Sequence, residues 1–211
     1  AGTDACTVTT EDDGEDHFYG DGAGIGSGYN GNMSGSITID ENAKVNAFSQ
    51  EDGAGIGSGE DGNMSGSITI SGNAQVTAGS GWDGAGIGAG ESDDDPPKSE
   101  MSGTITIGGN AKVTAWSEDS GAGIGAGEDG DVSGTIIIGG SAQVTAGSDD
   151  DGAGIGAGTY GSITSTGRII LRDSAKVTAI GEDEGTGIGA GDDGHMAGLI
   201  IIQDNAQITA I

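Results

Sequence analysis

The pentapeptide GAGIG recurs along the chain at an almost fixed spacing. It begins at Gly22, Gly53, Gly84, Gly121 and Gly152, and the variant GTGIG begins at Gly185. Successive starts lie 31, 31, 37, 31 and 33 residues apart. A period in this range is typical of solenoids, in which each unit buries its apolar face only by stacking on the next unit. The spacing therefore predicts a stack of six similar coils.

Each unit contains three stretches in which apolar residues alternate with polar or small ones. In the second copy these are GAGIG, residues 67–70 and residues 75–78. Alternation with a period of two indicates half-buried strands, and none of the stretches has the i, i+3, i+4 spacing of a helix. The predicted fold class is therefore all-β: a right-handed parallel β-helix with three short strands per coil.

Equivalent positions of stacked coils should form ladders. We expect apolar ladders of the GAGIG isoleucines, of the valines in the third stretch, and of the methionines after GAGIG, with Ile163 joining the last. A corner ladder is expected where the chain turns between the second and third strands, because Asn tolerates a left-handed bend and stacked Asn side chains can bond one another. Its members are Asn42, Asn73, Asn110 and Asn205, with Ser141 and Ser174 in the other copies.

The repeats define a single domain, 1–211. Residues 1–21 form a partial preceding coil and a long first loop, and residues 22–211 form the six repeats. Thr7 to Thr10 align with KVTA of the third strand, so the chain opens on one third strand and stops after another. We expect a fragment of a longer protein, whose ends meet other domains or a like subunit.

Charge and hydropathy exclude two classes of partner. The chain has 34 acidic residues against six basic ones, a net charge of −28. Binding to nucleic acid requires a basic footprint, which this composition lacks. No apolar stretch approaches the roughly 18 residues that a membrane span needs, so neither nucleic acid nor membrane insertion is expected.

Acidic residues gather in the two loops that flank GAGIG. Stacking would bring their carboxylates close together, where they repel unless solvated or neutralised. Calcium suits such loops because it takes six to eight oxygen ligands in irregular geometry. The candidate ligands are Asp52, Asp61, Asp119, Asp129, Asp151, Asp183 and Asp193. The alternative is a solvated acidic edge without bound metal, since the loops match neither the GGxGxDxUx calcium repeat nor an EF-hand loop.

Two sets of apolar residues are candidates for binding a partner. Phe48, Trp82 and Trp116 fall in the loop after the third strand of three consecutive coils, where they could bind carbohydrate or cap the core. Ile137, Ile170 and Ile201 occupy an outward position of the second strand that threonine holds in earlier coils. An outward apolar stripe indicates a contact surface for another domain or subunit, or cover by a local loop.

Two further functions have weaker support. The third strand presents an outward row of threonines, a feature of ice-binding solenoids, but its companion row alternates Lys and Gln, which electrostatic repulsion between stacked lysines explains. Arg168 and Arg172, with Asp173, are the one candidate for polysaccharide lyase chemistry, although such a pair is more often a local ion pair. We do not expect an enzyme.

The units GAGIGSG…GSITI…NAQVTA resemble the glycine-rich GAGIG repeats of long secreted or wall-attached proteins of Gram-positive, often gut, bacteria. The resemblance covers nearly the whole chain from about residue 20. It implies a parallel β-helix, an extracellular location and a structural or adhesive role, and it carries over no catalytic residue. The expected function is a non-catalytic structural and adhesive segment of an extracellular surface protein. The alternative is a carbohydrate-binding module, with or without dependence on calcium.

Overall fold

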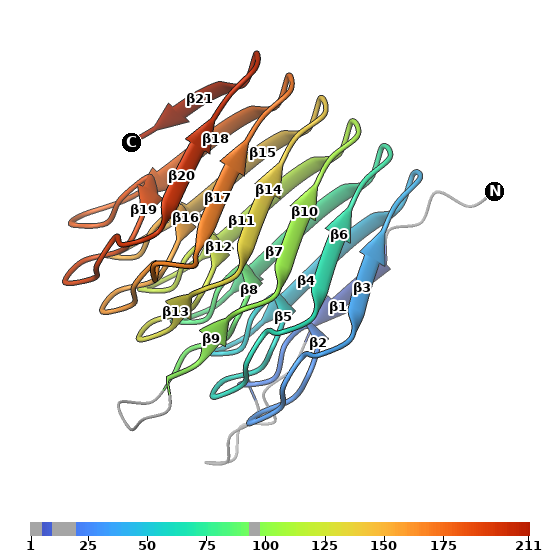
Figure 1. Cartoon of the computed structure of the whole chain (residues 1–211). Coiled ribbons are helices and arrows are strands. Elements are labelled where there is room, and N and C mark those ends of the chain that lie inside the picture. Colours follow the sequence, from blue (N-terminus) through green and yellow to red (C-terminus); the bar gives the residue numbers. More distant parts are fainter. Residues whose placement is uncertain (1–5, 10–19, 93–97) are drawn as a thin grey trace.

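The computed structural model describes residues 6–9, 20–92 and 98–211. These residues form an all-β solenoid whose coils stack in register from the N-terminal to the C-terminal side (Figure 1). The chain rises along one sheet in front, returns along another behind it and advances from right to left in Figure 1, so the coil is right-handed. No helix occurs in the described ranges. The predicted fold class is confirmed.

Three parallel sheets run the length of the stack. Sheet 1 carries the GAGIG strands β2 (Ile25–Gly26), β5 (Ile56–Gly57), β8 (Ile87–Gly88), β12 (Ile124–Gly125), β16 (Ile155–Gly156) and β19 (Ile188–Gly189). Sheet 2 contains β3 (Ser36–Ile39), β6 (Ser67–Ile70), β10 (Thr104–Ile107), β14 (Thr135–Ile138), β17 (Arg168–Leu171) and β20 (Leu199–Ile202).

Sheet 3 has seven strands: β1 (Cys6–Thr9), β4 (Lys44–Ser49), β7 (Gln75–Ser80), β11 (Lys112–Ser117), β15 (Gln143–Ser148), β18 (Lys176–Gly181) and β21 (Gln207–Ala210). A short pair, β9 (Glu100–Met101) and β13 (Asp131–Val132), lies between sheets 1 and 2 along the chain. β1 pairs with β4 as the edge strand, but Thr7 lies opposite Asn46, two residues from the expected alignment with Lys44. The long first loop expected after it falls mostly outside the described residues.

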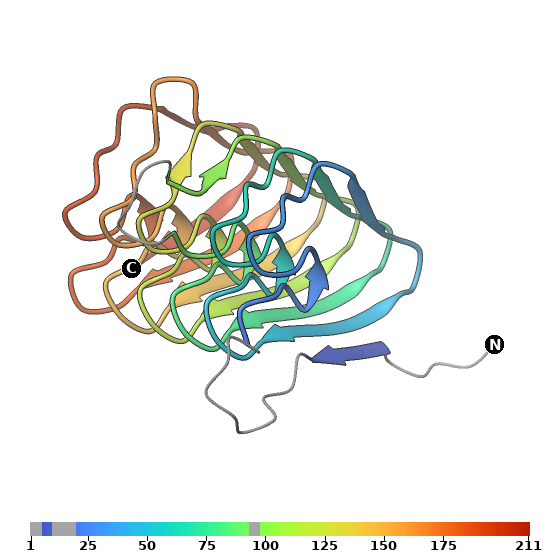
Figure 2. The ribbon, with the colours of Figure 1, turned by 90° about the horizontal axis from the view of Figure 1, so that it is seen from below.

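The interior is a set of apolar ladders, as predicted. The GAGIG isoleucines pair from Ile25 to Ile188, and the valines of sheet 3 from Val45 to Val177, followed by Ile208. The methionine ladder includes Ile163, which bridges to Val132 and Met196. The side chains that alternate inward are buried in the central coils. Figure 2 shows the ribbon of successive coils winding around a common interior.

Glycine in sheet 1 is required by the approach of one coil to the next. Gly57 has φ +148°, a conformation that L side chains rarely adopt, and a Cβ there would lie 1.7 Å from the carbonyl oxygen of Gly88. Gly26, Gly88, Gly125 and Gly156 have nearly the same φ and the same close approach to the next coil, and Gly189 in the last coil has nearly the same φ. The GAGIG motif therefore encodes close backbone stacking rather than a ligand loop.

The corner ladder is present, with one correction. Asn73 Nδ2 donates to Asn42 Oδ1 at 3.3 Å, and Asn110 Nδ2 donates to Asn73 Oδ1 at 3.2 Å. The left-handed residue is not the Asn but the one before it, for example Gly72 with φ +65° and Asp204 with φ +58°. Asn is used here for its side-chain amide, which links adjacent coils.

Candidate functional site

The two loops that flank GAGIG meet across the boundary between coils. The residue directly before a GAGIG motif accepts a hydrogen bond at its carbonyl oxygen. The donor is the N–H of the residue seven positions after the first glycine of the next GAGIG or GTGIG motif, at 2.8 or 2.9 Å. We call these junction pairs, and they are Asp21–Glu60, Asp52–Glu91, Asp83–Glu128, Ser120–Thr159 and Asp151–Asp192. The backbone therefore fixes which two side chains face each other at every junction.

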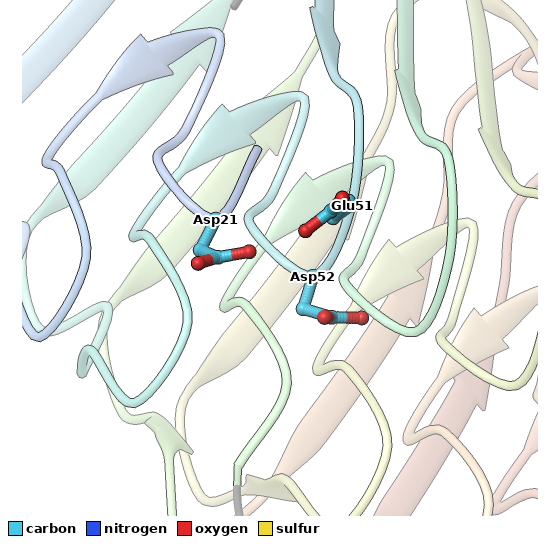
Figure 3. Close-up of side chains that lie close together, drawn as sticks. All are labelled: Asp21, Glu51 and Asp52. Carbon is cyan, nitrogen blue, oxygen red and sulfur yellow. The ribbon is translucent and has the colours of Figure 1, made fainter. Parts of the chain in front are cut away.

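The first three junction pairs form a continuous acidic row. Carboxylate oxygens of Asp52, Glu60 and Glu91 lie within 4.8 Å of one another, and those of Asp83, Glu91 and Glu128 do so in the next coil. A third group, Asp21, Glu51 and Asp52, comes from the loops that precede GAGIG in adjacent coils (Figure 3). The groups share residues, so the row runs across three coil boundaries.

Backbone donors hold the aspartates of the row in place. Asp52 Oδ1 accepts a hydrogen bond from the N–H of Asp83 at 3.3 Å, and Asp83 Oδ1 accepts one from the N–H of Ser120 at 3.0 Å. Each of these aspartates is therefore tied to the equivalent position of the following coil. The glutamates approach from the other loop and face these fixed carboxylates.

Burial and crowding favour the protonated form of the glutamates. Burial, followed by the charge of Asp52 and a hydrogen bond to it, raises the pKa of Glu91 to about 10. Burial, followed by the charge of Asp83 and a hydrogen bond to it, raises the pKa of Glu128 to about 8. Burial is also the largest reason that the pKa values of Asp21, Asp52 and Asp83 lie above the ordinary value. Near neutral pH, the Asp52–Glu91 and Asp83–Glu128 pairs therefore favour retention of a proton on the glutamate.

The donors in the row are those that hard divalent cations prefer. Carboxylate oxygens suit Ca²⁺, which accepts irregular ligand sets. Asp52, Glu60 and Glu91 would hold the ion at one junction, and Asp83, Glu91 and Glu128 at the next. Because Glu91 belongs to both groups, neutralising one junction would also relieve the other.

Of the seven predicted metal ligands, the structure places one, Asp52, in this row. Asp61, Asp129 and Asp193 instead occupy left-handed turn positions, with φ of 56°, 54° and 50°. The residue before each turn, Glu60, Glu128 or Asp192, belongs to the junction pair. Sequence reasoning missed Glu60 and Glu128 because each is followed by an aspartate, and two adjacent acids look equivalent until the turn decides which one lies at the junction.

The remaining predicted ligands lie apart from the acidic row. Asp119 precedes the hydroxyl junction pair and accepts a hydrogen bond from Ser120 Oγ at 3.2 Å. Asp151 and Asp183 line an open acidic pocket near the C-terminal side, with Asp150, Glu184 and Asp192. Burial and the charge of Asp151 raise the pKa of Asp150 there.

A second candidate site is a groove on the outer face of sheet 3, with a volume of about 510 Å³. It crosses the strands from β4 to β18. Its lining includes the outward rows Lys44, Gln75, Lys112, Gln143 and Lys176 and Asn46, Thr77, Thr114, Thr145 and Thr178. The threonine row thus lies in a groove rather than on a flat surface, which does not favour the ice-binding alternative.

The predicted position of the aromatic residues is wrong for two of three. The strands of sheet 3 run to the sixth residue, so Phe48 and Trp116 lie within β4 and β11 instead of in the following loop. Both are half-buried, and their rings pack over Gly79 and Gly147 of the next coil. Trp82 does lie in the loop and is 55% exposed.

The outward isoleucines are brought together. Ile137 pairs with Ile170 and Ile170 with Ile201 in sheet 2, and all three are half-exposed. Leu199, in the same sheet, is 46% exposed. The stripe is continuous with the threonine row of the earlier coils through Thr106, the partner of Ile137.

The basic residues of the fifth coil form a local contact. Arg172 Nε lies 3.8 Å from Asp173 Oδ2, and both side chains are about half exposed. Asp173 also accepts a hydrogen bond from the N–H of Gly140 at 2.9 Å. Arg168 is an exposed residue at the start of β17. This arrangement matches the local ion pair that the sequence offered as the alternative to lyase chemistry.

Comparison with protein families agrees with the fold. A model described as a beta helix repeat matches residues 37–60, 68–91 and 105–128. Each matched segment runs from a strand of sheet 2 to the glutamate of a junction pair. No curated protein and no solved structure matches the chain. In the described residues, no helix has the length and apolar character to cross a membrane. The chain thus carries beta helix repeats, a fold found in enzymes and in non-enzymes alike.

Proposed function

We propose that this chain is a rigid, non-catalytic segment of an extracellular bacterial surface protein, with a structural and adhesive role. The unbroken register of all three sheets over six coils supports this proposal. In such a stack each coil is the template for the next, so the outer rows form long, regular surfaces. Regular surfaces of this kind suit attachment, and the stripe of Ile137, Ile170 and Ile201 would contact a further domain or a like subunit.

A glycan array probed with the purified chain, with and without calcium, tests the adhesive role. Binding to a defined class of glycan supports adhesion. A chain that binds no glycan in either condition, and that does not associate with itself, would be a scaffold alone and would contradict the adhesive part of the proposal.

We also propose that calcium binds in the acidic row. The grouped carboxylates of Asp52, Glu60 and Glu91, and the cost of bringing unpaired charges together, support this part. Calcium at one hundred times its dissociation constant should add about 2.7 kcal/mol to the free energy of unfolding and so raise the melting temperature. A chelator should reverse the shift, whereas magnesium at the same concentration should raise the melting temperature less. An unchanged melting temperature would contradict calcium binding.

Carbohydrate binding is the second candidate function, and the groove on sheet 3 favours it. The groove is elongated and polar, and its lining of Thr, Asn, Gln and Lys offers a hydrogen-bonding group from every coil. Sugars present many hydroxyl groups along an extended chain, which such rows match. Titration of soluble polysaccharides by calorimetry measures this binding directly, and no heat with any polymer would remove this candidate.

A further inference from the structure

The outer face of sheet 3 repeats with a period of two coils, not one. Strands β4, β11 and β18 begin with Lys, whereas β7 and β15 begin with Gln. Four residues further on, the Lys strands carry Phe48, Trp116 and Ile180, whereas β7 and β15 carry Gly79 and Gly147. The last strand, β21, begins with Gln207 but has Ile211 at this position. In the five strands from β4 to β18, the large residue and the lysine therefore occur together in alternate coils.

Packing explains one of these alternations. A Cβ at Gly147 would lie 2.0 Å from Trp116 Cζ3, and a Cβ at Gly79 would lie 3.1 Å from Phe48 Cδ1. The Trp116 ring thus requires a glycine in the following coil, and the Phe48 ring packs tightly over one. Repulsion between stacked lysines explains the other alternation. Neither cause requires that the lysine and the large residue share a strand. Their occurrence together in β4, β11 and β18 is therefore a separate feature of the surface.

The groove concentrates lysines in a chain that has few basic residues. Lys44, Lys112 and Lys176 are half of the six basic residues, in a chain with 34 acids. The ion pairs of the described residues, Lys98–Asp129 and Arg172–Asp173, include none of them. The structure thus pairs basic groups elsewhere and leaves these three facing the groove.

Most of the acidic loops lie too far away to neutralise them. Glu118 follows β11 at the end opposite Lys112, six residues or about 20 Å along an extended strand. The Debye length at physiological ionic strength is about 8 Å. In the first coil Asp40 and Glu41 stand nearer to Lys44, but the turn before Lys112 contains Gly108 and Gly109. The centre of the groove is therefore locally basic.

We propose that this groove binds an extended anionic polysaccharide that lies across the strands, along the axis of the solenoid. Its carboxylate or sulfate groups would contact Lys44, Lys112 and Lys176, which recur every two strands, or about 9.6 Å. Its hydroxyl groups would contact the threonine and glutamine side chains. This inference rests on the carbohydrate-binding proposal and adds the class of ligand. A neutral glycan would leave the lysines without a partner, and nucleic acid needs a denser basic surface.

The chain itself supplies the substitutions for the test. Lys112→Gln introduces the residue that β7 and β15 already carry at this position, so the fold should be retained. Lys98→Gln removes the same charge outside the groove and is the matched control. Binding is measured by calorimetry with polygalacturonate, dextran sulfate, neutral dextran and polyglutamate. A chelator is present throughout, so that calcium at the acidic row cannot bridge to the polymer.

We expect polygalacturonate or dextran sulfate to bind, and the preferred one identifies the anionic group. Lys112→Gln should weaken binding about three- to tenfold, as expected for one charged hydrogen bond at an exposed site. The triple variant K44Q/K112Q/K176Q should abolish binding, and Lys98→Gln should leave it unchanged. Raising the salt concentration should weaken it.

Three results would overturn the inference. If dextran binds as well as the acidic polymers and no lysine variant matters, carbohydrate binding stands and the anionic class is wrong. If polyglutamate binds as tightly as polygalacturonate, charge alone selects the ligand and the glycan assignment is wrong. If none of the polymers binds, carbohydrate binding fails together with the inference.

Discussion

The acidic row predicts that the chain loses stability as the pH rises from 5 to 7. The folded chain holds protons on Glu91 and Glu128 up to pKa values of about 10 and about 8, whereas an unfolded chain releases them near the ordinary value of 4.5. A raised pKa in the folded state gives a stabilisation that is complete below about pH 4.5. This stabilisation is lost progressively as the pH rises towards the folded-state pKa values.

The magnitude follows from linkage. Each such group changes the free energy of unfolding by up to about 1.4 kcal/mol per pH unit between the two pKa values. For two glutamates this gives an upper limit of about 5 kcal/mol between pH 5 and pH 7. Because both side chains are partly exposed, solvent screening reduces this value, and we expect about 2 kcal/mol. In a chain of this size that loss lowers the melting temperature by about 4–8 °C.

The double variant Glu91→Gln/Glu128→Gln isolates the effect. Glutamine can still donate a hydrogen bond to Asp52 or Asp83 but carries no charge at either pH. The control, Glu118→Gln/Glu182→Gln, removes the same charge from exposed positions. Melting temperatures are measured with a chelator at pH 5 and pH 7. The fall between the two pH values should be smaller in the first variant than in the wild type, and as large in the control as in the wild type. Equal falls in all three chains would refute the reasoning, because general repulsion would then account for the pH dependence.

Two further predictions test the stack itself. Gly57→Ala should prevent close stacking and lower the melting temperature sharply, because its Cβ would lie 1.7 Å from the Gly88 carbonyl oxygen. Gly108→Ala is the control, because no atom lies within 4 Å of its Cβ, and it should change the melting temperature little. Met101→Ala should cost about 2–5 kcal/mol in chemical denaturation, because Met101 is fully buried in the ladder between Met64 and Val132. A cost below 1 kcal/mol would mean that the coils collapse around the cavity.

The fold could be predicted because a solenoid repeats one local rule. Period, alternation and ladder membership all follow from residues within a single unit, and even Ile163 was placed correctly across a two-residue insertion. Strand ends were less accurate. The third strand extends two residues beyond the alternating stretch, because Gly79 and Ser80 continue the pairing of β7 without an apolar side chain to reveal it.

The candidate site could be predicted only in part, for a geometric reason. Sequence placed acids in the correct two loops but could not show that a junction joins one loop to the other in the next coil. Asp52 and Glu91 are 39 positions apart, and the choice between Glu60 and Asp61 depends on a left-handed turn. Local patterns carry no information about either feature.

The junction pairs themselves indicate that the acids do more than keep the surface soluble. The five junction pairs act as internal comparisons: three are Asp with Glu, one is Asp with Asp, and one has hydroxyl residues on both sides, Ser with Thr. At the Ser120–Thr159 pair, Thr159 Oγ1 donates to the Ser120 carbonyl oxygen at 3.3 Å, so hydroxyl groups replace carboxyl groups on both sides. A solvated acidic edge would allow one partner to lose its carboxyl group alone, which occurs in none of the five pairs. Joint replacement is expected only where the two side chains must share something between them, and two facing carboxyl groups can share a proton or a cation where two hydroxyl groups need neither.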